Sequence, residues 1–469
     1  MYTIVRSELR SSWSAWLGVA LGFVMTSFAL ALSAMVLQSA LVARGTTVPL
    51  MEADAYAYNG GINLVLCLVV GLSVVASSTE LVVQSRRGAV ARLALAGATP
   101  VGIVSTVVSQ LTAVALASAV VGDLLAIAAL RPALAYLQHE RGQESAGRAA
   151  PAVVDARTLL AVGAAWVLVS VLGGLAQARR ASRIPPVEAL RVAQAADDSG
   201  RRMGLGRWLR AVLALVVTGL CWAMVPILTA HPDRETFTQI MQMNLLGLCV
   251  TGWFLAELSP VLVGPVTQLW TRHMPAGPAW QLGRATVLAK AARLTRSVVP
   301  VMFTVGLAFG VLGLPATYNA IFRASGYGVE LGHVGAATFL VNLGLPLAVA
   351  MCGSIGSLFM MSRQRDAELA LLGISGATGQ QRTAVATFEA LIVAGTATIL
   401  GLVMALSAFV YLAYGATSTG LTFSLALPLA SMLEAVLLTA LVTAAATVLP
   451  TLGALRIPEP KVIARLVAE

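Results

Sequence analysis

Charge is what this sequence has least of. Only 11% of its 469 residues are charged, whereas about a quarter are charged in an ordinary soluble domain. Hydrophobic residues make up 58% of the chain and give it a mean hydropathy of +0.83. A chain with so little polar surface cannot cover itself in water, and its apolar residues come in long runs. Lipid must therefore be the solvent for most of the chain, which excludes a string of soluble domains.

Lysine is also scarce. The two lysines are Lys290 and Lys461, and neither lies in the G-x-x-x-x-G-K-[ST] pattern that cradles the phosphates of a nucleotide. The sequence therefore offers no P-loop ATPase site, and we expect the chain itself to bind no cofactor.

Cysteine and histidine are few and scattered. The cysteines fall inside apolar runs without the spacing of metal ligands, which predicts small buried side chains. The four histidines pair with nothing, and we expect no metal site. The cysteines are Cys67, Cys221, Cys249 and Cys352.

The formal net charge of +10 would suggest nucleic-acid binding in a polar protein. Here the basic residues lie between apolar runs rather than together on one polar face, which is where the positive-inside rule places them. The charge balance therefore indicates membrane topology, with the lipid bilayer as a partner and no nucleic acid.

Ten apolar runs are long enough, at about 20 residues or more, to cross a bilayer as helices. The first run follows Arg6 and Arg10, but it is longer than the apolar core of a signal peptide, about 7–15 residues. The sequence predicts an all-α integral membrane protein with ten transmembrane helices, in residues 14–42, 62–83, 101–130, 159–175, 208–229, 243–269, 298–321, 336–361, 384–414 and 423–448.

Basic residues are unequally divided between the two sides of these spans. One side receives 24 of the 31 lysines and arginines, and the other side receives 7. The positive-inside rule assigns the richer side to the cytoplasm, and an even number of spans then places both termini there. We expect a multi-pass protein of the bacterial plasma membrane.

Two stretches of the chain resemble each other. Residues 84–99 and 363–378 both end in Gly-Ala-Thr, and aligning these triplets sets an offset of 279 residues. The same offset pairs Arg86 with Arg365 and Gln110 with Glu389. Each stretch follows the second span of its half, on the cytoplasmic side. The sequence thus predicts an internal duplication in a 4+2+4 arrangement of helices: a first half over 1–192, a linker with two helices over 193–280, and a second half over 281–469.

Each repeated stretch is predicted to form a short helix that a glycine ends. Gly97 and Gly376 suit the left-handed conformation of a helix C-cap, where a side chain would be strained. Such a helix at the membrane face could dock in a groove of a cytosolic partner. The alternative is an amphipathic connector lying among the lipid head groups. Two copies at equivalent positions favour docking on a two-fold symmetric partner.

The second stretch resembles the signature E-x-A-x-L-x-x-x-G-A-T of the FtsX-like, or MacB-type, ABC transporter permeases. The matching residues are Glu368, Ala370, Leu372, Gly376, Ala377 and Thr378, followed by Glu389 in the next span. The first stretch departs from the signature, with Ala89 in place of the glutamate and Gln110 in place of the later acid. The resemblance covers both four-helix halves and leaves the linking helices unexplained.

The resemblance implies that both stretches are coupling helices that meet separate cytosolic ABC ATPase subunits, two per chain. The chain would then be a transporter subunit and not an enzyme, with ATP and Mg bound by the partner. The implied coupling residues are Arg86, Arg87, Arg92, Gly97, Ala98 and Thr99, with Arg363, Arg365, Glu368, Gly376, Ala377 and Thr378.

The loops on the outer side are short. Many members of this family carry a large extracytoplasmic domain, but the loops here span only 43–61 and 323–335, and the longest covers 131–158. We therefore expect an amphipathic substrate, such as an antimicrobial peptide, an antibiotic or a lipid-like compound, to be exported from the outer leaflet.

Five polar residues within the predicted spans are candidates for function, since acidic groups in lipid cost about 2.5–3.5 kcal/mol on insertion scales. For Glu389, near the cytosolic face, we expect structural coupling. Asp123 and Glu257, deeper or nearer the outer side, are candidates for substrate or ion contacts, against the alternative of hydrogen bonding between helices. The five are Gln110, Asp123, Glu257, Glu389 and Glu434.

Two other functions stay open at this point. One is a membrane regulator that uses the same ATPase cycle to signal to a sensor kinase or an envelope enzyme. The other is a proton-coupled secondary transporter, which would work without any ATPase and would depend on Asp123 or Glu257.

Overall fold

The computed structural model describes most of the chain, and the described part contains helices and no strands. The described residues are 13–44, 50–85, 99–140, 151–182, 204–229, 234–272, 274, 277–326 and 336–455. The helices are α2 (Trp13–Ala43), α3 (Leu50–Ser85), α5 (Pro100–Glu140), α6 (Ala156–Ser182), α8 (Leu205–Leu228), α9 (Arg234–Thr271), α10 (Pro278–Ala289), α11 (Ala291–Ala324), α12 (Ala336–Ile374), α13 (Gly379–Ser418) and α14 (Leu429–Leu455).

Ten of these helices are long and apolar enough to cross a membrane, all of them except α10. This confirms, for the described residues, the all-helical class and the predicted ten spans. The longest helices, α5 with 41 residues and α13 with 40, exceed what a bilayer needs. At 1.5 Å per residue each reaches about 60 Å, about twice the thickness of the hydrocarbon core. Both must therefore project beyond it.

The offset between the two halves recurs in the helix bounds. Helix α13 begins at Gly379, which lies 279 residues after Pro100, the first residue of α5. In the first half α2 packs on α3 and α5, and α5 packs on α6; in the second half α11 packs on α12 and α13, and α13 packs on α14. The 4+2+4 grouping and the cytoplasmic location of the termini stay predictions.

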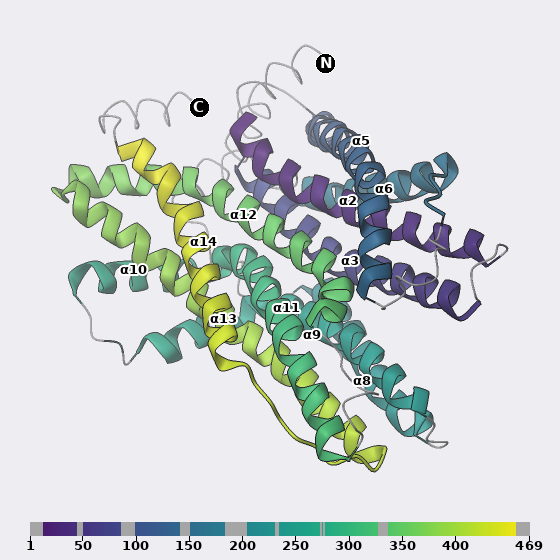
Figure 1. Ribbon diagram of the computed structural model, residues 1–469. Helices are drawn as coiled ribbons and strands as arrows, with labels where there is room; N and C mark the ends of the chain where they lie inside the picture. The colour runs from purple at the N-terminus through teal and green to yellow at the C-terminus, as the bar shows by residue number, and fades with distance from the viewer. Residues whose placement is uncertain are drawn as a thin grey trace.

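The halves meet mainly where α12 packs against α2 and α3. In Figure 1 helices α2, α3, α5 and α6 lie together on the upper right, and α10 to α14 lie on the left and below. The linking helices α8 and α9 pack on each other, and α9 also contacts α3, α11 and α13. Helix α11 is the centre of the bundle, since 89% of its spanning segment is buried, against 6% for α14.

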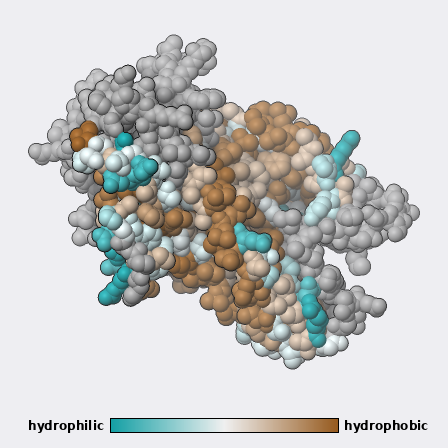
Figure 2. Space-filling view, turned by 60° about the vertical axis from the view of Figure 1, so that its left-hand side comes forward, coloured by the Kyte–Doolittle hydropathy of each residue, from teal (hydrophilic) through white to brown (hydrophobic). Residues whose placement is uncertain are grey.

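Apolar side chains cover much of the described surface (Figure 2). Leu209 and Ile227 on α8 are 71% and 65% exposed, and Leu441 on α14 is 67% exposed. A protein in water would bury such side chains, so this surface fits a lipid environment. The prediction for the cysteines is confirmed: three are buried and Cys352 is partly buried.

The predicted outer loop over 131–158 is wrong for its first ten residues, because α5 continues to Glu140. Pro132 lies inside this helix. Membrane proteins tolerate a proline within a helix because neighbouring helices can satisfy the backbone groups that it leaves free. Leu134 and Leu137 are 4% and 7% exposed and belong to a cluster that includes Met35 of α2. Packing against α2 therefore extends the helix past a residue that usually ends one.

The prediction that the last span begins at residue 423 is also wrong. Helix α13 ends at Ser418, Gly420 follows it at φ +76°, residues 421–428 are not helical, and α14 begins at Leu429. Pro428 directly precedes α14, and a proline disfavours helical backbone in the residue before it. The Thr317 hydroxyl donates a 2.9 Å hydrogen bond to the backbone oxygen of Ala426 and ties the segment to α11.

Helix α6 begins where Asp155 caps it. The Thr158 hydroxyl donates to Asp155 Oδ2 at 2.9 Å, and the backbone N–H groups of Arg157 and Thr158 donate to its two oxygens at 3.2 Å. These bonds, the one from the Thr158 side chain first, hold the pKa of Asp155 below its ordinary value. The cap fixes the beginning of α6, which the count of basic residues assigns to the outer side of the membrane.

Candidate functional site

The second predicted coupling stretch forms the corner between α12 and α13. The expectation of a separate short helix is wrong, because α12 runs unbroken from its membrane span to Ile374. No proline interrupts the stretch from residue 361 to 374, so one continuous helix is the simplest outcome. Arg363, Arg365 and Glu368 lie on this helix, and their side chains are outside the described part of the structure.

Gly376 ends α12 in the predicted way. Its φ is +96°, in the region that favours glycine, and a methyl group added to its Cα would have no atom within 4 Å. The N–H of Gly376 donates to Gly373 O at 3.1 Å, and the N–H of Ala377 donates to Leu372 O at 2.9 Å. This pair of bonds is a Schellman motif. The prediction of a left-handed C-cap is confirmed for Gly376.

Thr378 then begins α13. Its hydroxyl accepts from the N–H of Gln381 at 3.3 Å, while the Gln381 side chain accepts from the N–H of Thr378 at 2.9 Å. This is a capping box, which satisfies two free N–H groups at once. Thr99 caps α5 with its hydroxyl alone, accepting from the N–H of Gly102 at 3.2 Å. In the second stretch the Gly-Ala-Thr triplet therefore builds a corner: glycine ends one helix and threonine caps the next.

We expect Thr378→Ala to loosen this corner by about 1 kcal/mol, the usual cost of losing an N-cap. Hydrogen exchange followed by mass spectrometry should show faster exchange of the amides at the start of α13. Thr378→Ser keeps the accepting hydroxyl and should exchange as the parent does. Equal exchange in the alanine variant would mean that packing alone holds the corner.

The other members of the first stretch, Arg86, Arg87, Arg92, Gly97 and Ala98, lie outside the described residues.

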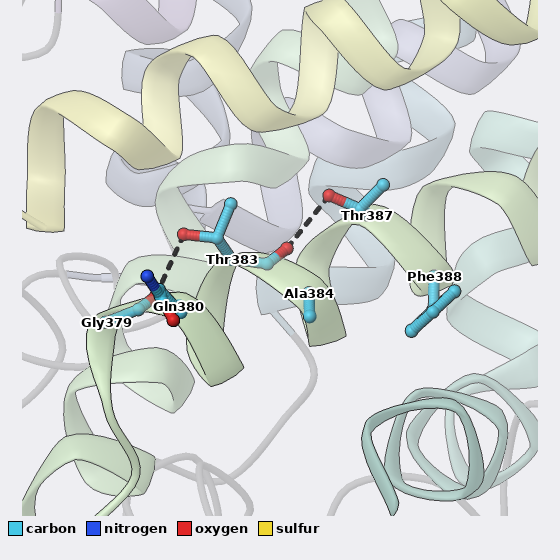
Figure 3. A pocket seen from close by; sticks show the side chains of 6 residues that line it. All are labelled: Gly379, Gln380, Thr383, Ala384, Thr387 and Phe388. Carbon is cyan, nitrogen blue, oxygen red and sulfur yellow. Dashed lines mark hydrogen bonds between the residues drawn. The ribbon is translucent and has the colours of Figure 1, made fainter. Parts of the chain in front are cut away.

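An open pocket of about 700 Å³ follows the corner on the first turns of α13 (Figure 3). The hydroxyls of Thr383 and Thr387 point back to their own helix, where they donate to the backbone oxygens of Gly379 and Thr383 at 2.9 Å. The walls are therefore largely methyl groups and the ring of Phe388, without an ionisable side chain. Such a pocket suits contact with another protein or lipid rather than catalysis. It is lined by Gly379, Gln380, Thr383, Ala384, Thr387 and Phe388.

Helix α10 braces the same turns of α13. Trp280 meets the ring of Phe388 edge-on at 5.6 Å between centroids, and meets Trp270 of α9 at 6.3 Å. Gly283 of α10 faces α13, since a methyl added to it would be in van der Waals contact with Val385 O at 3.4 Å. Sequence reasoning missed this helix; Pro278 at its first turn was the available signal.

Hydroxyl groups continue this bracing into the membrane. Thr267 of α9 and Thr396 of α13 are joined at 2.9 Å, and the indole N–H of Trp270 donates to Thr396 at 3.0 Å. Arg284 of α10 donates to the Thr271 hydroxyl at 2.9 Å. Helices α9, α10 and α13 are thus fixed to one another by polar bonds, which are costly to break away from water.

Gln110 and Glu389 occupy equivalent places in the two halves. Each lies ten residues after the first residue of its helix, and they are 0% and 8% exposed. Both side chains therefore face the interior of the bundle close behind the coupling corner, rather than lipid. This location fits the structural coupling expected of Glu389.

Glu257 is paired with arginines of α8. Its two carboxylate oxygens accept from Arg210 at 2.7 and 3.2 Å, and Arg207 donates to its backbone oxygen at 3.0 Å. Glu257 thus lies level with the beginning of α8, the end that the charge count assigns to the cytoplasm, and not toward the outer side. Because the Arg210 side chain is 50% exposed, the pair contributes at most about 1 kcal/mol to the stability of the fold.

Asp123 and Glu434 lie on helices with lipid-exposed faces. One carboxylate oxygen of Asp123, Oδ1, is buried and has no hydrogen-bond partner. Glu434 is exposed near the beginning of α14, which starts at Leu429. The structure therefore does not bring the five predicted intramembrane residues together in one site.

Comparison with known protein families adds one finding. Residues 61–186 match the family described as FtsX-like permease C-terminal. The matched region covers α3 from residue 61 onward, α5 and α6, and it includes the first Gly-Ala-Thr triplet. A search of curated proteins found no match.

Proposed function

With an FtsX-like permease domain over residues 61–186, the chain is an ABC transporter permease-type membrane subunit, and we propose that it exports an amphipathic substrate. Members of this family have no ATPase site of their own and generally partner with cytosolic ABC ATPases. In our proposal two such subunits bind one chain, with ATP and Mg²⁺ held by the partner. The substrate is an antimicrobial peptide, an antibiotic or a lipid-like compound.

The observation that carries the proposal is the rigid corner at Gly376, Ala377 and Thr378. A Schellman motif and a capping box join α12 to α13 and satisfy backbone groups on both sides of the turn. Helix α10 packs against the first turns of α13, and the bond between Thr267 and Thr396 ties α13 to α9 further into the membrane. A force applied at the corner is therefore transmitted along helices rather than lost in a loop.

The path from the corner leads to the contact between the halves. Helix α12, which ends at the corner, packs along α2 and α3 of the first half. We propose that ATP binding draws the two coupling stretches together and tilts the halves against each other at this contact. The lipid-exposed apolar surface of α5, α8 and α14 favours a substrate that arrives from the membrane.

An affinity purification of the tagged chain from its native membranes tests the proposal. We expect a P-loop ATPase to co-purify at two copies per chain, with ATPase activity that the permease modulates. Purification in a mild detergent without any ATPase would contradict the transporter proposal and favour the proton-coupled alternative. An ATPase accompanied by a stoichiometric sensor kinase would favour the regulatory alternative.

A further inference from the structure

Several polar atoms without partners lie on three adjoining helices, α2, α5 and α6. Four buried side-chain atoms there have no hydrogen-bond partner: Ser27 Oγ, Asp123 Oδ1, Trp166 Nε1 and Ser170 Oγ. The two serines and the tryptophan are at most 2% exposed. Buried polar groups in proteins are normally satisfied by protein, water or ligand. Asp123 is the one among them that can carry a charge, so it is the candidate to bind a polar group of a ligand.

Contacts link the three helices near Ser27, Asp123 and Trp166. A methyl group added to Gly122 of α5 would lie 2.8 Å from Ser27 Cβ, so α5 and α2 nearly touch beside Asp123. A methyl added to Gly163 of α6 would lie 3.5 Å from Asp123 Oδ2. Trp166, one turn after Gly163, then meets α2 again through Phe23. The ring of contacts thus passes from α2 to α5 to α6 and back (Figure 1).

The carboxylate at this point can be reached from lipid. Asp123 is itself only partly buried, and its neighbours Val120 and Leu124 are 59% and 62% exposed. On α6, Leu160 is 73% exposed, and Gly163 lies beside Asp123 without a side chain of its own. Asp123 lies 19 residues after Val104 and 14 before Leu137, the ends of the α5 span. The site is therefore deep in the membrane and faces the acyl chains.

We propose that Asp123 binds the ammonium group of a cationic amphiphile that enters between α5 and α6 from the lipid phase. The carboxylate supplies the opposite charge, and the Ser27 hydroxyl can accept a second N–H bond. The exposed leucines and valines beside it accommodate the hydrocarbon tail. The inference rests on the proposed function only for the claim that the bound amphiphile is transported; binding itself does not require it.

Quenching of Trp166 fluorescence by a primary alkylamine with bromine atoms on its chain tests the proposal in lipid nanodiscs. We expect concentration-dependent quenching in the parent chain, and loss of that component in Trp166→Phe. Asp123→Asn, which keeps the shape of the side chain, should weaken the apparent affinity about tenfold or more. Asp123→Glu should keep most of it, because the charge remains.

Two controls distinguish binding of the amine to the charge of Asp123 from simple partition of the amine into the bilayer. A brominated alcohol of the same chain length should quench equally in the parent and in Asp123→Asn. Asp155→Asn removes another acid, at the beginning of α6. Asparagine caps a helix as well as aspartate does, so amine binding should not change. Equal amine affinity in the parent and Asp123→Asn would overturn the proposal, as would equal affinity for amine and alcohol.

The outcome is independent of the test of the proposed function. Amine binding that depends on Asp123, in a chain that recruits no ATPase, would uphold the site and refute the ABC transporter proposal. Recruitment of the ATPase by Asp123→Asn as by the parent would show that this variant is folded, so that lost amine binding reports on the carboxylate.

Discussion

Replacing Gly356 with alanine is expected to lower the melting temperature of the purified chain by about 1–3 °C, because overpacking of this kind typically costs 1–3 kcal/mol and the unfolding entropy of a chain of this length is about 1 kcal/mol per degree. A methyl group at this position on α12 would overlap the backbone oxygen of Gly18 on α2. A methyl on Gly18 would in turn lie 2.5 Å from the backbone oxygen of Gly356. Since both neighbours are backbone, no side-chain rotation relieves the clash, and the helices must separate.

Gly219→Ala on α8 is the matched control, because an added methyl there meets nothing within 4 Å. Alanine is favoured over glycine in a helix by about 1 kcal/mol, so this variant should melt at the same temperature as the parent or slightly above it. Differential scanning fluorimetry in one detergent compares the three proteins. Equal shifts in both variants would show that helix propensity, and not the contact between halves, decides the result.

The contact at Gly18 and Gly356 makes the two halves unequal. The offset of 279 residues relates Gly18 to Ser297 on α11, and Gly356 to Ser77 on α3. The contact between α2 and α12 thus brings backbones together at glycines, as small residues allow in membranes, whereas the related positions carry serines. Helix α9 packs on both α3 and α11, the helices that carry these serines. The two predicted halves therefore differ in the residues available for contact between them.

Local rules made several features predictable from the sequence. Ten spans follow from hydrophobic length, since a run of about 20 apolar residues crosses lipid as a helix that satisfies its own backbone hydrogen bonds. The left-handed Gly376 follows from the absence of a Cβ, and the caps at Thr99 and Thr378 belong to the same repeated triplet. In each case a few neighbouring residues determine the outcome, so no knowledge of the rest of the fold is needed.

Features that depend on distant contacts could not be predicted in this way. Pro132 stays helical because residues beyond it pack on α2, almost a hundred residues earlier in the chain. Glu257 pairs with Arg210 and Arg207, which lie 47 and 50 residues earlier on α8. No sequence pattern indicated where α8 packs. The unpartnered atoms around Asp123 come from three helices, and only the packed bundle shows that they adjoin.

Reversing both charges at Arg365 and Glu368 is expected to reduce co-purification of the ATPase about tenfold or more, because like charges brought together at an interface cost several kcal/mol. The two residues are three positions apart on α12, so they share a helix face in the last turns before Gly376. The double reversal keeps one acidic and one basic residue at this spacing, which leaves the pairing within the helix available. The corner itself, built by backbone bonds and Thr378, should remain intact.

Reversal of Arg86 in the first stretch is expected to have a smaller effect. The position equivalent to Glu368 carries Ala89, so the first stretch offers an ATPase one acidic contact fewer. The ratio of ATPase to permease after affinity purification measures both effects, and an unchanged melting temperature shows that each variant is folded. A larger loss from Arg365 and Glu368 means that the second stretch provides most of the docking energy. Equal losses would mean that both stretches engage the ATPase dimer with the same strength, and that the departures of the first copy from the family signature carry no energetic weight.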